Sequence, residues 1–217
     1  MNYNHFIKKL SHSNLFRNFI FWIGTVRHLC VFPWVTWDHH NPCVTHDEID
    51  QNIVPKLEIG DVGVHCDHGF LSNLFIPGSF KHAWIHVDQT QIIEATHEGV
   101  LQKSCRNPLR TDDLVIVRPK LPLSAKMEAV ERAKTALGFV YDVNFDFDLK
   151  SEFRHLNKHD QAFSCIEVVA YAYYSNFKDL GFKWVKHYGK KVLYPDTVVN
   201  PNWDVVYSNV PKIKVTI

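Results

Sequence analysis

The stretch Ala162-Phe163-Ser164-Cys165-Ile166-Glu167-Val168-Val169-Ala170-Tyr171-Ala172-Tyr173 is almost entirely apolar and carries a cysteine near its start. It predicts a buried helix with Cys165 in the first turn. Unpaired backbone N–H groups and the helix dipole favour negative charge at that end, so the thiolate of Cys165 is usable as a nucleophile. The alternative is simple packing, because free cysteine is among the most buried residue types. A nucleophilic role therefore requires a base and a residue that orients the base.

The composition indicates a folded protein with no strong electrostatic bias. The chain has 217 residues, 46% of them hydrophobic, which suffices for one packed domain with an extension. Lys and Arg total 24 and Asp and Glu total 23, so nucleic-acid binding is disfavoured. The cysteines are odd in number and lack a C-x-x-C pair, which favours free thiols and a reducing, cytoplasmic location. They are Cys30, Cys43, Cys66, Cys105 and Cys165.

Residues 1–50 are predicted to form an extension that precedes a domain of residues 51–217. Apolar residues recur at helical spacing in residues 6–31, which predicts one or two amphipathic helices. These helices either dock on the domain, the interpretation we favour, or contact a membrane surface as a peripheral anchor. The apolar run between Arg17 and Arg27 is about half of the ~20 residues that a membrane span requires.

Residues 38–48 form a loop rich in potential metal ligands, among them His39, His40, Cys43 and His46. A structural zinc site pairs two close ligands with a second close pair further on, and no second pair with matching spacing is evident. We therefore predict a solvated linker here and no metal site.

From residue 57 the pattern predicts an α+β fold with a small antiparallel sheet. Short β-like runs are broken by Gly and Pro, and they cover residues 61–66, 83–87, 91–95, 114–117, 204–207 and 213–217. Between them a helix is predicted to start at a Ser124 cap and to end before Gly138. The face of this helix that is expected to pack on the sheet carries Met127, Val130, Ala133 and Leu137.

Residues 81–87 alternate between the two faces of a predicted strand. The core face carries Ala83, Ile85 and Val87. His82 and Trp84 therefore point to the other face. A three-residue loop to the next strand pairs Val87 with Gln91. Glu94 then lies opposite Trp84 and one diagonal step from His82, where a carboxylate fixes the tautomer of an imidazole. A two-residue turn would reverse the parity and move Glu94 to the wrong face.

Eight short motifs occur in a fixed order along residues 57–200. They are Gly60-Asp61-Val62, Gly69-Phe70-Leu71-Ser72-Asn73-Leu74, Lys81-His82-Ala83, Ile93-Glu94-Ala95, Tyr141-Asp142, Phe145-Asp146-Phe147, Ser164-Cys165-Ile166-Glu167-Val168 and Tyr194-Pro195-Asp196. In this order the chain resembles the permuted papain-like amidases of the NlpC superfamily, which include cysteine peptidases. The resemblance implies a circularly permuted papain-like fold, a sheet or half-barrel packed on the helix of the cysteine. It also implies a catalytic triad of Cys165, His82 and Glu94.

Two positions depart from the family pattern, and residues 1–50 lie outside the match. The family commonly has a small residue where Trp84 stands, so this indole either walls the substrate cleft or packs beneath the extension. Ser164 stands where the family often has an aromatic or small residue, and it is expected to cap the helix. We expect substrate contacts from Trp84, Asp61, Ser164 and Tyr141. The backbone N–H of Cys165 is expected to hold the oxyanion, and the second donor is either a group of the Asp61 loop or a tyrosine.

The function expected is thiol-dependent hydrolysis of an amide through an acyl-enzyme, with a small-molecule, peptide or acyl substrate and no cofactor. Two other functions stay open. Lipid acyl hydrolysis or transfer at a membrane would suit the aromatic residues 6–31. A ligand-binding or interaction module that keeps the scaffold with an inert site would show no preferential alkylation of Cys165.

Overall fold

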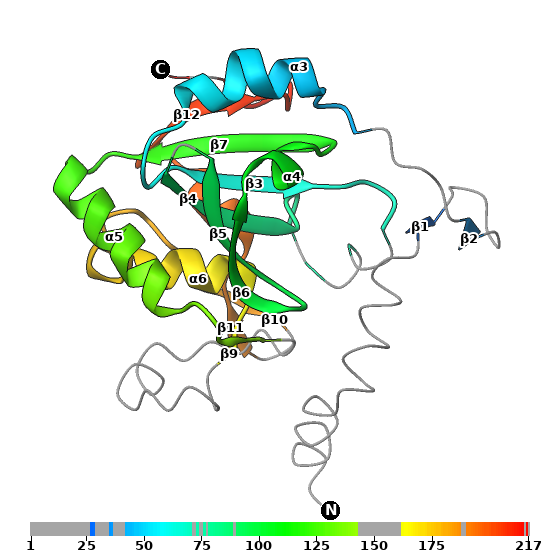
Figure 1. Cartoon of the computed structure of the whole chain (residues 1–217). Coiled ribbons are helices and arrows are strands. Elements are labelled where there is room, and N and C mark those ends of the chain that lie inside the picture. Colours follow the sequence, from blue (N-terminus) through cyan, green and yellow to red (C-terminus); the bar gives the residue numbers. More distant parts are fainter. Residues whose placement is uncertain are drawn as a thin grey trace, which may run out of the picture.

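A computed structural model describes residues 27–28, 35–36, 42–70, 73, 76, 78–88, 90–142, 162–187, 190–214 and 216. Its central element is an antiparallel sheet in the order β12-β7-β3-β4-β5-β6 (Figure 1). The strands of this sheet are β3 (Val62–Cys66), β4 (His82–Asp88), β5 (Gln91–Thr96), β6 (Gly99–Ser104), β7 (Asp113–Pro119) and β12 (Trp203–Ser208). The α+β class is therefore confirmed.

Helices cover both faces of the sheet. The helices are α3 (His46–Glu48), η1 (Ile49–Ile53), η2 (Val54–Lys56), α4 (Arg106–Leu109), α5 (Leu123–Thr135), α6 (Cys165–Ala172), η5 (Tyr174–Asn176) and η6 (Pro195–Val198). Three short ladders complete the described structure. They pair β1 (Arg27–His28) with β2 (Val35–Thr36), β8 (Val140–Tyr141) with β9 (Ala162–Phe163), and β10 (Val185–His187) with β11 (Lys190–Val192).

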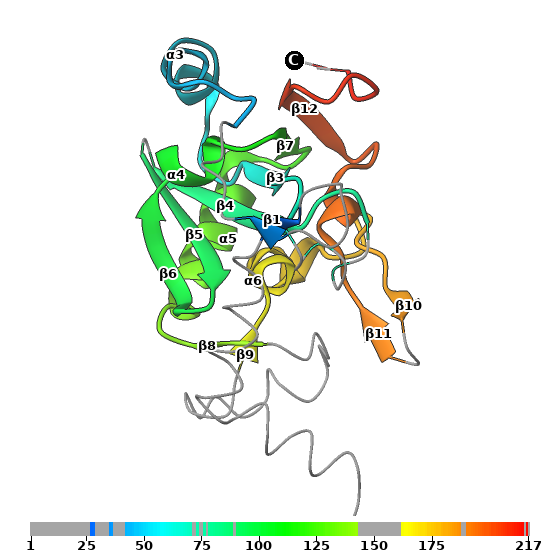
Figure 2. The ribbon, with the colours of Figure 1, turned by 90° about the vertical axis from the view of Figure 1, so that its right-hand side faces the viewer.

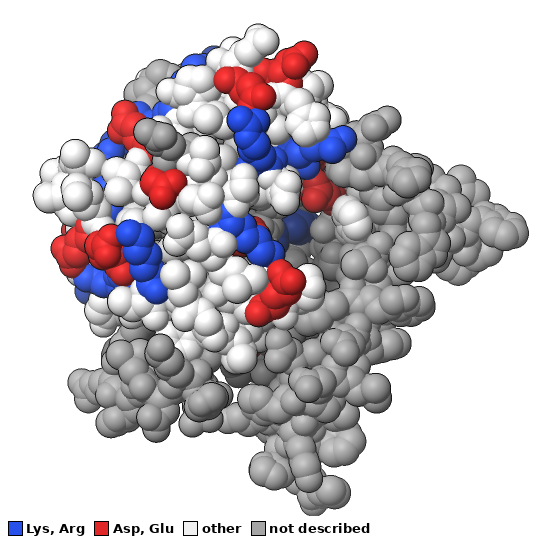
Figure 3. All heavy atoms as spheres, in the orientation of Figure 1, with Lys and Arg blue, Asp and Glu red and all other residues white. Residues whose placement is uncertain are grey.

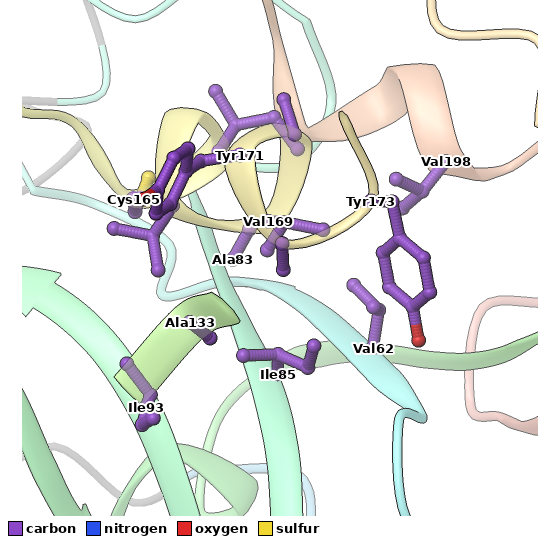
Figure 4. Packing of buried hydrophobic residues seen from close by; sticks show 14 of the residues in the cluster. Val62, Ala83, Ile85, Ile93, Ala133, Cys165, Val169, Tyr171, Tyr173 and Val198 are labelled. Atoms are coloured by element: carbon purple, nitrogen blue, oxygen red, sulfur yellow. The ribbon is translucent and has the colours of Figure 1, made fainter. Parts of the chain in front are cut away.

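The main hydrophobic core lies between the sheet and the helices α5 and α6. Every residue of α6 is buried, as its almost uniformly apolar sequence predicts. Figure 4 shows α6 lying across β4, with Val169 facing the strand that carries Ala83 and Ile85. These two strand residues are the core-facing residues expected from the alternation in residues 81–87. Figure 2 views α6 nearly along its axis, with β4, β5 and β6 to its left.

A second core fills the opposite face of the sheet, beneath the consecutive helices α3, η1 and η2 (Figure 1). Ile49 and Ile53 of η1 are buried there against Trp84 of β4. The predicted boundary between residues 50 and 51 is therefore displaced, because it falls inside η1 and would separate these two isoleucines. Val44 is also buried in this core, so the segment from Val44 to Ile53 packs as part of the domain.

Trp84 is fully buried in this second core, which corrects its prediction as a substrate contact. Gly63 of β3 is its partner in the register and leaves the space that the indole occupies, since a Cβ at Gly63 would overlap the ring. Trp84 thus packs beneath residues 44–53 and is not part of a cleft wall. This packing explains the large side chain at position 84, because burial of an aromatic ring is strongly favourable.

Several predicted elements differ in detail. Helix α5 begins at Leu123 after an N-cap at Pro122, so Ser124 lies within its first turn. Met127 is half exposed, whereas Lys126 is buried in its place. The predicted strand 213–217 is absent at its described residues, although the N–H of Thr216 donates to the carbonyl of Val205 at 2.9 Å. Strand β6 and helix α4 were not predicted.

The first 41 residues are described only in the ladder of β1 and β2. Amphipathic helices are predicted for residues 6–31, and most of these residues lie outside the described ranges. Arg27–His28, within this stretch, forms a strand instead of a helix. Within the described ranges, no helix combines the length and the apolar character that crossing a membrane requires. Figure 3 shows acidic and basic side chains interspersed over the face it presents.

We predict that Gly63→Ala lowers the free energy of unfolding by about 1–3 kcal/mol, because the new methyl group forces the Trp84 indole out of its position. Urea unfolding followed by circular dichroism measures this loss. The same substitution in a Trp84→Leu background should lose less, since the smaller side chain leaves room. Equal losses in the two backgrounds would show that the indole is not the obstacle.

Candidate functional site

The register of the hairpin β4–β5 brings Glu94 to the face of His82. Trp84 pairs with Glu94, as predicted, but the predicted pairing of Val87 with Gln91 is wrong. Asp88 pairs with Gln91 instead, and the register shifts between His86 and Asp88. The shift has the form of a bulge, and this extra residue restores the parity that a two-residue connection would otherwise reverse.

His82 and Glu94 form a direct contact on this face. The Nε2 atom of His82 lies 2.8 Å from Oε2 of Glu94. Their side chains are 22% and 9% exposed, respectively, so the pair is largely shielded from water. Because Nε2 is held by the carboxylate, Nδ1 is the ring nitrogen left to exchange a proton with another group.

Cys165 begins helix α6 and is buried. Its side chain is close enough to His82 for a hydrogen bond between the two. Ser164 holds the N-cap position, and its backbone N–H donates to the carboxylate of Glu167 at 2.7 Å. This bond fixes the start of the helix and hence the position of the sulfur. The thiol therefore meets the imidazole at a helix N-terminus, where negative charge is favoured.

The electrostatics of His82 and Glu94 favour the charged form of both. Burial alone lowers the pKa of His82, but the negative charge of Cys165 and a hydrogen bond with it, together with Glu94, raise this pKa to about 10. Burial raises the pKa of Glu94, yet the hydrogen bond with His82 and its positive charge, and the charge of Lys103, lower it overall. The arrangement thus favours a positively charged imidazole at His82 beside an ionised carboxylate at Glu94.

His65 is a member of the site that the sequence did not reveal. It is the register partner of His82 across β3 and β4, and the two ring centroids lie 4.9 Å apart. Burial, with the positive charge of His82, lowers the pKa of His65 to about 3, so it stays neutral. Its Nδ1 has no hydrogen-bond partner among the described residues. Alternation within residues 61–66 would have found it only with knowledge that β3 pairs with β4.

An open pocket of about 300 Å³ adjoins the side chains of His65, His82 and Glu94. Its lining residues come from β3, β4, β5, β6 and α4. Its lining residues are His65, His82, Glu94, Lys103, Ser104, Asn107 and Pro108. The pocket therefore reaches the imidazole of His82 from the side of Glu94.

Tyr141, for which a substrate contact is predicted, lies near the sulfur of Cys165. Burial raises the pKa of its phenol far above the usual range, and the negative charge of Cys165 and of Glu167 adds to this effect. Strand β8 places it there, because Tyr141 pairs with Phe163 in parallel register two residues before Cys165. A neutral phenol beside the sulfur is a candidate hydrogen-bond donor to a developing oxyanion.

Asp61 does not reach this site, which corrects its prediction as a substrate contact. It is fully buried, and its two carboxylate oxygens accept hydrogen bonds from Arg118, each at 2.8 Å. Its carbonyl accepts from the N–H of His86, four residues along β4 from His82. Four strand residues span about 13 Å, so Asp61 marks the opposite end of the sheet.

Ser164 is likewise buried, at the N-cap position of α6, where its backbone N–H donates to Glu167, and it has no exposed surface for substrate. No metal site is predicted for the ligand-rich loop of residues 38–48. Residues 38–41 of this loop lie outside the described residues. Among the residues that are described, no group of three or more His, Cys, Asp or Glu side chains is arranged to hold a metal ion.

Comparison with known proteins adds no assignment. No family model, curated protein or solved structure matches the chain. The site must therefore be interpreted from its own geometry.

We predict that iodoacetamide at neutral pH modifies Cys165 faster than Cys66 or Cys105. Burial raises the pKa of both other thiols, that of Cys66 to about 11. The rates for individual cysteines are measured by mass spectrometry of peptides. His82→Gln should slow the reaction of Cys165 by about tenfold or more and leave Cys105 unchanged as the internal reference. A Cys165 rate that does not respond to this substitution contradicts the assignment of His82 as its partner.

Proposed function

We propose that this protein is a thiol-dependent hydrolase that cleaves an amide bond in a small-molecule, peptide or acyl substrate. The observation that carries the proposal is that the imidazole of His82 contacts both Glu94 and Cys165. Its Nε2 lies 2.8 Å from Glu94, and Cys165 is the first residue of α6. Nucleophile, base and orienting group are the three parts that covalent catalysis needs. The permuted papain-like fold and the relation to NlpC-type amidases are part of the same proposal.

The reaction proceeds in two stages. His82 accepts the proton of Cys165, and the thiolate adds to the carbonyl carbon of the substrate. The C–N bond breaks as the leaving amine takes the proton from His82, which leaves a thioester on Cys165. Water then gives a proton to His82 and attacks the thioester, and collapse of the intermediate returns this proton to the sulfur. Atoms and protons balance without a cofactor.

Glu94 orients the imidazole through both stages. Its bond to Nε2 directs Nδ1 toward Cys165 and stabilises the imidazolium that forms when the thiol loses its proton. Because this carboxylate is largely buried, water screens the interaction little. Glu94 therefore acts on the rate through His82 and does not itself contact the scissile bond.

The helix N-terminus supplies the oxyanion site in this proposal. The N–H of Ser164 is occupied by Glu167, so the N–H of Cys165, in the first turn, is the next donor along the backbone. The phenol of Tyr141 is the side-chain candidate for a second donor, since burial keeps it protonated. Asp61, the other group considered from the sequence, is engaged with Arg118.

We predict that Cys165→Ala abolishes hydrolysis and that Glu94→Gln lowers kcat/KM by about 10²- to 10⁴-fold, since an orienting group tunes a base that remains present. The probes are a panel of N-acyl amino-acid p-nitroanilides and, in parallel, acyl p-nitrophenyl esters of increasing chain length with and without vesicles. Lys134→Met, on the exposed side of α5, is the control variant.

Circular dichroism verifies that all variants are folded. Equal losses for Glu94→Gln and Cys165→Ala would mean that the two roles are assigned wrongly. Preference for long-chain esters on vesicles would instead support a lipid acyl hydrolase. Absence of turnover with every probe, combined with slow alkylation of Cys165, would support an inert binding module.

A further inference from the structure

Glu94 has a second charged neighbour besides His82. The Nζ atom of Lys103 on β6 lies 3.9 Å from Oε1 of Glu94, the oxygen that does not contact His82. The same ammonium lies 2.8 Å from Oε2 of Glu98, in the turn between β5 and β6. Lys103 therefore lies between the largely buried carboxylate of the site and a carboxylate that is 53% exposed.

The register of the sheet places Lys103 in this position. Glu94 pairs with Leu101, and Ile92 pairs with Lys103, so Lys103 is on the face of Glu94 at a diagonal position. A lysine side chain spans this diagonal easily. Ile92 belongs to the core beneath the same face, so the strand that carries Glu94 is held firmly against β6.

We propose that Lys103 is a positioning residue of the triad, which keeps Glu94 ionised and directed at His82 whether or not the imidazole carries a proton. The inference rests on the function proposed above. During the reaction His82 alternates between imidazolium and neutral imidazole, and in the neutral state a buried carboxylate loses its principal cation. Lys103 supplies the positive charge that remains, and Glu98 keeps the ammonium in place from the solvent side.

The charged and titratable groups near Glu94 come from three other strands of the sheet. His82 approaches from β4, neutral His65 from β3 and Lys103 from β6. Glu98 reaches Lys103 from the turn, and its pKa is lowered by this hydrogen bond. Among these groups Lys103 is the basic side chain that contacts Glu94 directly and takes no part in the proton exchange between His82 and Cys165.

Removal of the Lys103 charge is expected to shift the pKa of Glu94 in a defined direction. Lys103 lowers the pKa of Glu94, so its loss raises this pKa and Glu94 becomes protonated at a higher pH. Protonated Glu94 no longer stabilises the imidazolium, and the reactive pair of His82 and Cys165 then disappears at that higher pH. A residue with a merely structural role would lower the rate without moving the pH at which it falls.

The decisive experiment compares the acid limb of Cys165 alkylation by iodoacetamide in the wild-type chain and in Lys103→Met. We expect the midpoint of this limb to move up by about 0.5–1 pH unit, a value reduced by the 34% exposure of Lys103. Lys103→Arg should restore the wild-type profile, because it retains the charge. Lys134→Met, which removes an exposed lysine paired with Glu131, should leave the midpoint unchanged.

A second measurement separates this inference from the proposed function. In a Cys165→Ala chain, which has no nucleophile, the ring resonance of His82 in NMR spectra reports the protonation of Glu94. An upward move of that transition with Lys103→Met supports the positioning role even where no hydrolysis is found. An unchanged transition overturns it even where Cys165 is reactive. If Lys103→Met does not fold, Lys103→Gln is tested by the same two readouts, and unchanged midpoints again overturn the inference.

Discussion

The burial of α6 is the constraint on which the other parts of the site depend. This helix is apolar on nearly every side, so its free energy of folding is favourable only when other elements surround it. The sheet packs on it through β4 and β5, and α5 lies beside it (Figure 4). A helix enclosed in this way cannot shift along its axis without exposing apolar surface. The position of Cys165, the first residue of α6, is therefore set by the packing of residues elsewhere in the core.

The second requirement is a register that the bulge in β4–β5 preserves. His82 and Glu94 meet only when both side chains project from the same face, and a slip by one residue would separate them. The extra residue near Asp88 compensates for the short connection. Strand β3 adds His65 on the same face, and the neutral ring of His65 lies beside His82 without adding a competing charge. The site is thus a product of strand parity over three neighbouring strands.

The sequence was sufficient for features that depend on local periodicity. The buried helix of Cys165 follows from its apolar run. The opposition of Trp84 and Glu94 was predicted from alternation, but with a three-residue connection that is wrong, and in the structure the bulge before Asp88 keeps the parity. Features that depend on distant pairing were not accessible. The partner of β3 places His65, and the packing of η1 on the opposite face decides that Trp84 is covered. Neither contact leaves a local pattern, because its two sides are separated by many residues in the chain.

Two buried carboxylates at opposite ends of the sheet show why one end is suited to chemistry. Asp61 is paired with Arg118, whose pKa is raised further by the hydrogen bond with this carboxylate, so the guanidinium keeps its charge near neutral pH. Glu94 is paired with His82, which belongs to the residue type whose ordinary pKa lies closest to neutrality and which lies within hydrogen-bond distance of Cys165. Both pairs satisfy the same electrostatic need of a buried acid. Only the histidine pair can release and regain a proton, and this difference in the cationic partner separates a structural ion pair from a candidate catalytic one.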